Sequence, residues 1–293
     1  MLTLRLGALK KVLKPSNLRF LATQVQDDII FEKLFGSDTG IALYGLNKQK
    51  DRNALGYDLV NAMRSVHKQI KDESKVSVVI FHSLVPGIFC AGANLKERLK
   101  MTEQETMAFV TELRSLSSEL ASLPVATIAA IDGAAMGGGL ELALCCDILI
   151  AADTAKLGLV ETGRGVIPGA GGTQRLPRLI NPHVAKELIL TAKVIDGKEA
   201  KTLGLVNHAV PQNSSKNAAF EKALSIARDI IPNAPIALKC AKQSVNEGLQ
   251  LPIEEALKVE EKYVNQNVLT AKKDRKEGLV AFLEKRKPVY TGE

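Results

Sequence analysis

Apolar and polar positions along the first third of the chain predict short strands and an amphipathic helix. Residues 28–34 and 40–46 are rich in strand-forming side chains, and the turn residues between them indicate a hairpin. After the polar loop 47–53, apolar residues recur at the three- and four-residue spacing of a helix that runs to about residue 71. We expect Asn53 to cap the start of that helix.

The next part of the chain alternates strands with helices. Residues 77–81 have the composition of a buried strand. Thr102 and Glu105 have the spacing of a capping box, which predicts a helix that ends before Pro124. A further apolar strand follows at residues 125–131. This alternation predicts an α/β core, although the pattern alone fits both a spiral of repeated turns and a doubly wound sheet.

The character of the chain changes at about residue 212. Before that point we expect short helices at 171–178, 182–191 and 197–203 and a last strand at 205–210. After it, four amphipathic helical segments follow with no strand between them, near residues 215–231, 234–247, 252–267 and 271–285. We therefore divide the chain into a core at 23–212 and a helical C-terminal region at 213–293.

Three consecutive glycines, residues 137–139, stand where a strand ends and a helix begins. They allow either close packing of the helix on a strand or approach of backbone N–H groups to a ligand at the positive end of the helix dipole. No G-x-G-x-x-G pattern occurs here, and residues 169–173 lack the lysine of a P-loop. If a ligand binds, an oxyanion hole is the better interpretation.

Composition and charge narrow the possible classes of protein. The chain has 293 residues, of which 46% are hydrophobic and 4% aromatic, and it has no Trp, so base-stacking surfaces are scarce. The four cysteines lack metal-ligand spacing, which favours reduced structural thiols. Residues 1–22 contribute five of the basic side chains and no acid, so their removal would lower the net charge from +7 to +2. We interpret them as an amphipathic mitochondrial presequence, with an ordinary basic N-terminus as the alternative, and no segment suits a membrane span.

Five motifs together resemble the enoyl-CoA hydratase (crotonase) family. They are residues 89–96, 130–143, 158–161, 167–176 and 277–286, and the resemblance covers about residues 28–293. It implies an α/β crotonase-type spiral of ββα units, whose helical C-terminal region forms homo-trimers that often pair into hexamers. It also implies an acyl-CoA thioester as the substrate.

The resemblance assigns specific roles to residues of this sequence. It places the oxyanion hole on the backbone N–H groups of Ala93 and Gly138, the two catalytic carboxylates on Glu141 and Glu161, and Gly169 in the same pocket. Without the resemblance, Glu141 could equally be a favourable charge near a helix N-terminus and Glu161 an ordinary loop carboxylate.

The resemblance also implies where CoA binds. The CoA-contacting positions are Asn53, Ala54, Leu55, Ala91, Ala93, Asn94, Leu95 and Lys96. Asn94 stands where the family usually has Asp, which argues against a charged contact there. Phe282 and Lys285 match positions that reach the CoA of a neighbouring subunit.

The two carboxyl groups suit the addition of water to an enoyl thioester. Hydration needs a base for water and an acid for the α-carbon, and crowded carboxyls divide such roles because both cannot easily ionise. We assign Glu141 to water activation and Glu161 to protonation of the α-carbon. No metal or redox cofactor is implied, since CoA is part of the substrate.

Several functional alternatives remain open. Within the family, the motifs resemble mitochondrial hydratases that act on 3-methylglutaconyl-CoA in leucine breakdown and also their general enoyl-CoA hydratase relatives. Arg164 is either a cation for a distal carboxylate or a solvated loop residue. RNA binding is disfavoured, because the in-register positions Tyr57, Asn61 and Ser65 are uncharged. A catalytically silent acyl-CoA-binding scaffold is another alternative, and the expected location is the mitochondrial matrix.

Overall fold

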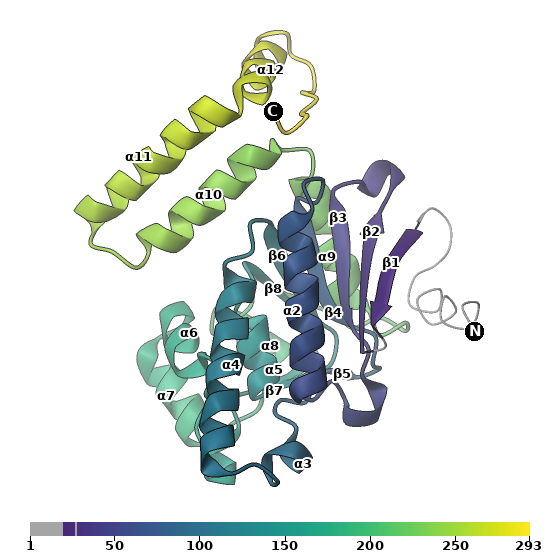
Figure 1. Cartoon of the computed structure of the whole chain (residues 1–293), viewed down its shortest axis with the longest axis vertical. Coiled ribbons are helices and arrows are strands. Elements are labelled where there is room, and N and C mark those ends of the chain that lie inside the picture. The colour runs from purple at the N-terminus through teal and green to yellow at the C-terminus, as the bar shows by residue number, and fades with distance from the viewer. Residues whose placement is uncertain (1–19, 27) are drawn as a thin grey trace.

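A computed structural model describes residues 20–26 and 28–293 of the chain (Figure 1). Most of the predicted presequence, residues 1–19, lies outside the described residues. The remaining part of that prediction, residues 20–22, falls within the first strand, β1 (Phe20–Gln26).

The larger of two sheets has seven strands in the order β1-β2-β3-β4-β6-β8-β11. After β1, its members are β2 (Ile29–Leu34), β3 (Ile41–Leu46), β4 (Val78–Ser83), β6 (Ala126–Ile131), β8 (Ile148–Ala152) and β11 (His208–Val210). The first three strands pair antiparallel, and β3, β4, β6, β8 and β11 run parallel. The β2–β3 pair confirms the predicted hairpin.

The smaller sheet has four strands in the order β10-β9-β7-β5. These strands are β5 (Ile88–Cys90), β7 (Ala134–Met136), β9 (Lys156–Gly158) and β10 (Ile195–Asp196). β5, β7 and β9 run parallel, and β10 pairs antiparallel with β9. Successive turns place one strand in the large sheet, the next in the small sheet and then a helix. This repeat confirms the predicted spiral of ββα units.

Eleven α-helices and three short 3₁₀ turns occur in the described part of the chain. The α-helices of the core are α2 (Tyr57–Asp72), α3 (Leu95–Arg98), α4 (Glu103–Ala121), α5 (Gly138–Ala143), α6 (Gly172–Leu179), α7 (Pro182–Leu190), α8 (Gly197–Thr202) and α9 (Ala218–Ile230). Three more follow: α10 (Pro235–Gly248), α11 (Ile253–Thr270) and α12 (Lys272–Leu283). The 3₁₀ turns are η1 (Gly36–Asp38), η2 (Gln49–Asp51) and η3 (Glu161–Arg164). None of these helices is both long enough and apolar enough to cross a bilayer.

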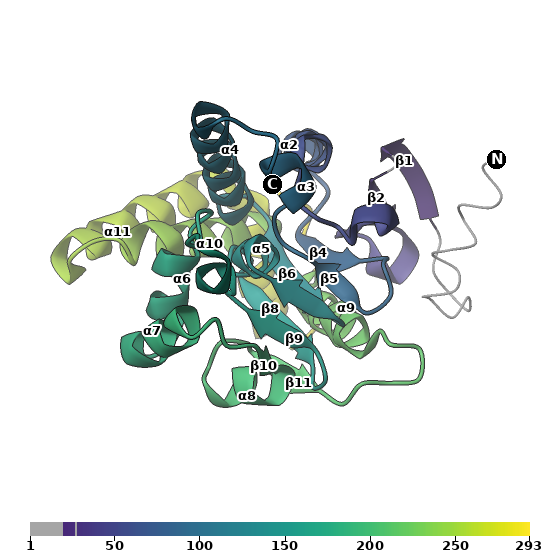
Figure 2. The same cartoon turned by 90° about the horizontal axis from the view of Figure 1, so that it is seen from below.

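Two apolar layers cover the opposite faces of the large sheet. In β3, Ile41 and Leu43 pack on one side with α9, whereas Tyr44 and Leu46 pack on the other side with α2 and α4. Figure 2 shows α2 and α4 together on one side of strands β4, β6 and β8. The composition change at about residue 212 marks the end of the strands, but α9 still packs as part of the core. The helices that leave it begin with α10.

Two predicted helix caps have opposite outcomes. The capping box of α4 is confirmed, because Thr102 Oγ1 accepts a hydrogen bond from Glu105 N at 3.2 Å and Glu105 Oε2 accepts one from Thr102 N at 2.8 Å. The prediction that Asn53 caps the following helix is wrong. The N-cap of α2 is Gly56, and Asn53 is fully buried.

The side chain of Asn53 holds loops that are distant in sequence. Its oxygen accepts a hydrogen bond from Lys48 N at 2.8 Å. Its amide nitrogen donates to Ser83 Oγ at 2.8 Å and to Phe89 O at 2.9 Å. Local sequence gives no sign of these long-range partners, so capping was the simpler interpretation.

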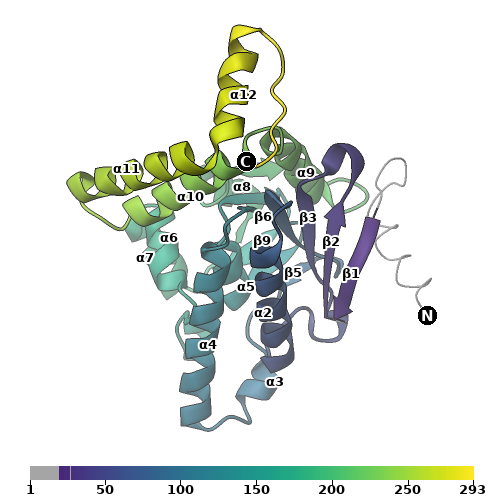
Figure 3. The same ribbon diagram turned by 45° about the horizontal axis from the view of Figure 1, so that its top comes forward.

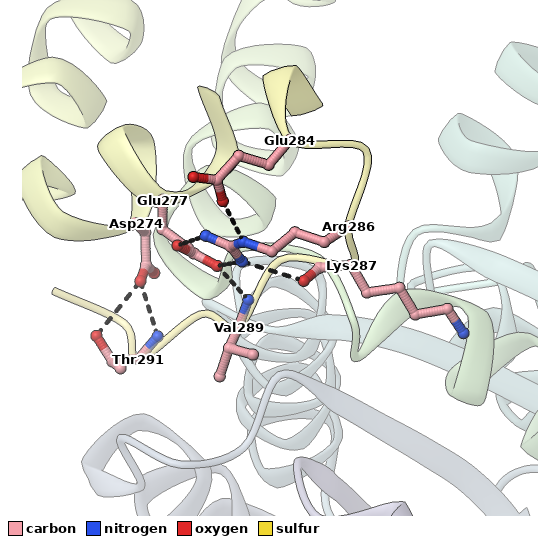
Figure 4. Close-up of polar contacts among 7 residues, drawn as sticks. All are labelled: Asp274, Glu277, Glu284, Arg286, Lys287, Val289 and Thr291. Carbon is pink, nitrogen blue, oxygen red and sulfur yellow. Dashed lines mark hydrogen bonds and ion pairs between the residues drawn. The ribbon is translucent and has the colours of Figure 1, made fainter. Parts of the chain in front are cut away.

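Helices α10–α12 and the segment after them form a C-terminal arm, residues 235–293. Figures 1 and 3 show α10 and α11 side by side and α12 pointing away from the sheets. The chain then folds back along α12, where Asp274 accepts hydrogen bonds from Thr291 N at 2.7 Å and Gly292 N at 2.9 Å. Arg286 joins Glu277 and Glu284 in ion pairs (Figure 4). The arm therefore has a defined end that is held by its own polar contacts.

Candidate active site

Three loops that leave the small sheet converge at one edge of it. Cys90 pairs with Ala135, and Met136 pairs with Gly158, so β5, β7 and β9 end side by side. Because the strands are parallel, the segments that follow their carboxyl ends emerge at the same edge. These segments carry Ala93, Gly138 and Glu161 respectively. The topology thus brings together residues separated by up to 68 positions in the sequence.

Two backbone N–H groups lie free at this edge. Ala93 forms an isolated parallel bridge with Leu55, in which Leu55 N donates to Gly92 O at 2.7 Å and Asn94 N donates to Leu55 O at 3.0 Å. Because Ala93 lies between the two residues that bond to Leu55, its own N–H points away from Leu55.

Gly138 is the first residue of α5, where an N–H has no partner within the helix. A Cβ on Gly92 would lie only 3.5 Å from Gly138 N, so the Ala93 and Gly138 amides come from adjacent backbone segments. Neither N–H donates a hydrogen bond within the described residues. Two free donors that meet beside a helix N-terminus can stabilise a negatively charged oxygen.

The glycine run serves both of the purposes that the sequence left open. A Cβ on Gly139 would overlap the carbonyl of Cys90, so this glycine permits close packing. Gly137 has φ +51° and ψ −124°, and a Cβ there would lie 2.9 Å from Glu161 Oε1. The backbone conformation at Gly137 and its closeness to a carboxylate both require glycine.

Glu141 lies in the short helix α5 with its carboxylate inside the protein. Its side chain is 3% exposed, and its Oε1 accepts hydrogen bonds from Ala170 N at 2.8 Å and Gly172 N at 2.7 Å. Burial raises the pKa of Glu141, whereas these hydrogen bonds and the positive charge of Arg175 act in the opposite direction. The carboxylate is therefore held in a fixed orientation by the loop after Gly169.

Glu161 faces Glu141 from the 3₁₀ turn η3. Burial, and then the negative charge of Glu141, raise the pKa of Glu161 to about 7. Its Oε2 is buried and has no hydrogen-bond partner within the described residues. The two carboxyls therefore have different surroundings. Backbone N–H groups bind the Glu141 carboxylate, whereas the environment of Glu161 favours its protonated form. This asymmetry allows one carboxyl to act as a base and the other as an acid near neutral pH.

Gly169 introduces the loop that holds Glu141. A Cβ on Gly169 would lie 2.8 Å from Val110 Cγ1 of α4, so the absence of a side chain lets the loop approach that helix. Sequence reasoning included Gly169 in the pocket but missed Ala170, Gly172 and Arg175. Their proximity to Glu141 arises from a contact across about thirty residues. The glycine-rich sequence of this loop was the available signal.

The segment expected to bind CoA borders the same edge. Ala91, Leu95 and Lys96 are exposed, whereas Ala54 and Leu55 are buried beneath them. Asn94 caps α3, because its Oδ1 accepts a hydrogen bond from Glu97 N at 3.4 Å, and its Nδ2 also donates to Glu97 Oε1 at 2.6 Å. Asn53 has all its polar groups engaged within the protein, so the expectation that it contacts CoA directly is wrong. It holds the segment from behind.

Phe282 lies on α12 and Lys285 follows it, and Figures 1 and 3 show α12 well apart from α5, the helix that carries Glu141. Phe282 is 83% exposed, and Lys285 has a left-handed backbone with φ +55°. A single chain does not bring these residues to the site. Arg164, by contrast, lies next to the site, and its charge lowers the pKa of Glu161 against the larger opposing effects.

The donor atoms at this edge suit an oxyanion and proton transfer. Within the described residues, no group of three or more His, Cys, Asp or Glu side chains could hold a metal ion. The four cysteines are free and buried. Burial raises the pKa of Cys90, which lies closest to the CoA segment, to about 12. This thiol therefore stays protonated near neutral pH.

Comparison with known proteins identifies the family of this chain. The family model for enoyl-CoA hydratase/isomerase matches residues 36–293. The mitochondrial methylglutaconyl-CoA hydratase of Mus musculus is 48% identical over 270 residues, which are 92% of this chain and 85% of that protein. The mitochondrial enoyl-CoA hydratase domain-containing protein 2 of the same species is 47% identical over 271 residues, 92% of this chain and 91% of that protein.

A solved structure shows the same fold. The crystal structure of enoyl-CoA hydratase from Bacillus anthracis matches with a TM-score of 0.85 and 42% identity, and the match covers 91% of this chain and all of that one. The sequence match, the shared fold and the paired carboxyls at the edge of the small sheet agree. The chain belongs to the enoyl-CoA hydratase/isomerase family.

Proposed function

We propose that this protein adds water across the 2,3-double bond of an enoyl-CoA thioester, with Glu141 and Glu161 as the catalytic pair. The observation that carries the proposal is their asymmetry. Backbone donors hold the Glu141 carboxylate, whereas the pKa of Glu161 is raised to about 7. The site therefore offers both a base and an acid near neutral pH.

The proposed reaction follows from this arrangement. The Glu141 carboxylate accepts a proton from water as the water oxygen bonds to C3 of the thioester. Electron density moves onto the thioester oxygen, which the N–H groups of Ala93 and Gly138 stabilise. Glu161 donates its proton to C2 as the enolate collapses. The product is a 3-hydroxyacyl-CoA, and transfer of the proton from Glu141 to Glu161 restores the starting state.

The test compares matched glutamate variants. Glu161→Gln and Glu141→Gln each lose about 10³-fold or more in kcat, because the amide can neither accept nor donate the required proton. Affinity for a saturated acyl-CoA, measured by calorimetry, should change less than about threefold. Glu187→Gln, at an exposed position on α7, is the control and keeps full activity. Hydration by Glu161→Gln at the wild-type rate would contradict the assignment.

We infer that CoA lies along the exposed segment at residues 91–96. Lys96 is exposed in the first turn of α3, where its ammonium can meet a phosphate. Lys96→Ala should raise KM for CoA esters about tenfold and leave kcat unchanged, because it removes binding made equally in ground and transition states. An unchanged KM would remove Lys96 from this role.

The acyl group is either a short linear chain or a branched diacid such as 3-methylglutaconyl. Arg164 favours the second, since it places a positive charge beside Glu161 at the expected acyl end. The relatives named above carry both kinds of name, so they do not decide. Rates with crotonyl-CoA and 3-methylglutaconyl-CoA, for wild type and Arg164→Met, distinguish the substrates. A diacid enzyme loses its preference for the diacid in that variant.

We further propose that the protein works as a trimer or a pair of trimers in the mitochondrial matrix. The relatives reported above are named as mitochondrial, and the arm carries exposed apolar side chains. Analytical ultracentrifugation and imaging of a tagged chain test the two statements. RNA binding and a silent acyl-CoA scaffold are the competing functions, and turnover of an enoyl-CoA excludes the silent scaffold.

A further inference from the structure

Arg175 occupies an unusual position beside the glutamate pair. It lies on α6, one turn after the loop that holds Glu141, and it is partly buried. Its Nη1 donates a hydrogen bond to Ala170 O at 3.0 Å. The N–H of the same residue, Ala170, donates to Glu141 Oε1 at 2.8 Å. Arg175 therefore fixes, through one residue, the orientation of a donor to the catalytic carboxylate.

Gly171 makes this contact possible. Its φ is +113°, and a Cβ there would overlap Nη1 of Arg175. The guanidinium therefore lies directly against the backbone between the two N–H groups that bind Glu141, those of Ala170 and Gly172. A side chain at position 171 would displace the guanidinium from this place.

The charge of Arg175 is not neutralised by a carboxylate of its own. Among the described residues, it takes part in no ion pair within 4.0 Å. The acidic group whose pKa it lowers is Glu141, and it also lowers the pKa of the buried Cys145 thiol. A partly buried cation that has no ion-pair partner acts on a nearby anion more strongly than an exposed cation does.

We propose that Arg175 is a positioning residue for the hydration reaction, which fixes the 169–172 loop and places a positive charge beside the Glu141 member of the carboxyl pair. The inference rests on the proposed function of the glutamate pair. Without Arg175, the two carboxyl groups in this largely buried site would differ less in their affinity for a proton. The division between base and acid would then weaken.

Other titratable groups near Glu141 do not replace this charge. Glu161 on η3 and Cys145 after α5 are both acidic groups, so neither can supply a positive charge to Glu141. Of the remaining elements packed on α5, β7 carries no titratable side chain and β5 carries only Cys90.

The charged side chains of α4, which also packs on α5, are all partly or fully exposed. They are Glu103, Glu105, Glu112, Arg114 and Glu119. Arg164 on η3 acts on Glu161. Arg175 is thus the cation that acts on Glu141 within the described residues.

Two substitutions separate the charge of Arg175 from its hydrogen bond. Arg175→Gln keeps a donor for the Ala170 carbonyl but removes the charge, and Arg175→Lys keeps the charge but removes the planar fork. Arg178, one turn further on the same helix, is exposed, and within the described part of the chain it donates hydrogen bonds to Gln174 alone. Arg178→Gln is therefore the matched control.

The first readout is the pH dependence of hydration. In Arg175→Gln, the acid limb of kcat/KM should move up by about one pH unit, and kcat at neutral pH should fall about tenfold with KM nearly unchanged. Arg175→Lys should return the limb to within a few tenths of a unit of wild type. Arg178→Gln should change neither quantity. An acid limb at the wild-type position in Arg175→Gln would overturn the proposal.

The second readout needs no catalysis. With glutamate labelled by ¹³C at the carboxyl carbon, the signal missing from Glu141→Gln reports the titration of Glu141. Its midpoint should rise by about one pH unit in Arg175→Gln and stay in place in Arg178→Gln. If wild type hydrates no enoyl-CoA, the proposed function fails while this titration still decides the role of Arg175. An unchanged midpoint contradicts that role even in an active enzyme.

Discussion

The edge of the small sheet and the C-terminal arm are built in opposite ways. At the edge, the catalytic candidates are supported from within one chain, and Glu141 is 3% exposed with two backbone donors on one oxygen. On the arm, large apolar side chains face outward. They include Val245, Leu249, Ile253, Leu257, Val264, Leu279 and Phe282.

The difference separates chemistry from assembly. A single chain supplies the free amides and both carboxyls, so the reaction geometry depends on local backbone conformation. The arm buries little of its apolar surface within one chain, so its contribution depends on what covers it. Changes at the edge should therefore act at any protein concentration, whereas changes on the arm should act through assembly.

Among the substitutions that compare the edge with the arm, the largest effect is expected at Gly137. Gly137→Ala should lower kcat more than 100-fold and the free energy of unfolding by about 2–3 kcal/mol, because its backbone conformation excludes a side chain and a Cβ would press on Glu161. Gly165→Ala is the control, since Gly165 also has a positive φ, +72°, but open space around it. That variant should cost about 1 kcal/mol and little activity. Urea unfolding and initial rates measure both, and equal effects would contradict the account.

A smaller effect is expected from the arm. Phe282→Ala should reduce the stability of the oligomer and raise KM for CoA esters about tenfold, while chemistry at saturating substrate changes little. Leu190→Ala, at an exposed apolar position on α7, should do neither. Sedimentation velocity and steady-state kinetics over a range of protein concentrations measure the effect. A fall in kcat with unchanged assembly would break the distinction between the two regions.

The end of the arm offers a third test. Asp274 is 2% exposed and accepts hydrogen bonds from Thr291 N and Gly292 N. Asp274→Asn should lower the free energy of unfolding by about 1–2 kcal/mol, because an ionised acceptor is replaced by a neutral one. Asp229→Asn, at an exposed position on α9, should change it by less than about 0.5 kcal/mol. Thermal or urea unfolding of both variants decides.

The smallest effect concerns the pH dependence of stability. A carboxyl whose pKa is higher in the folded than in the unfolded state lowers the free energy of unfolding when it ionises. The loss of stability that Glu161 causes therefore grows between about pH 4.5 and 7. Glu161→Gln should remove it, and the variant should gain about 1 kcal/mol relative to wild type at pH 8 but not at pH 4.5, after allowance for partial solvent exposure. Urea unfolding at both pH values measures this. An equal difference at both pH values would argue against a raised pKa.

Sequence reasoning succeeded where the determinants are local. The Thr102 and Glu105 capping box lies within four residues, and the β2–β3 hairpin joins neighbouring segments. Both follow from short-range patterns. The strands of the small sheet were missed because each is two or three residues long. Such a strand is too short to show the alternation of apolar and polar residues that identifies strands in a sequence.

Sequence reasoning failed where a side chain finds distant partners. Asn53 fits a cap by residue type, yet it bonds to Ser83 and Phe89 across thirty or more positions. Arg175 gave no signal of its relation to Glu141, which depends on the fold of residues 169–172. The candidate glutamates came from resemblance to a family. Their unequal surroundings became visible only in three dimensions.

The most direct test of the central claim is the pH profile of crotonyl-CoA and 3-methylglutaconyl-CoA hydration, followed by loss of the enoyl-thioester absorbance. For wild type, kcat/KM with the better substrate should fall at high pH, with an apparent pKa near 7 as Glu161 loses its proton, and at low pH as Glu141 gains one. Glu161→Gln should be inactive throughout. A wild-type profile that stays flat well above pH 7, or turnover by Glu161→Gln, would contradict the division of acid and base between the two glutamates.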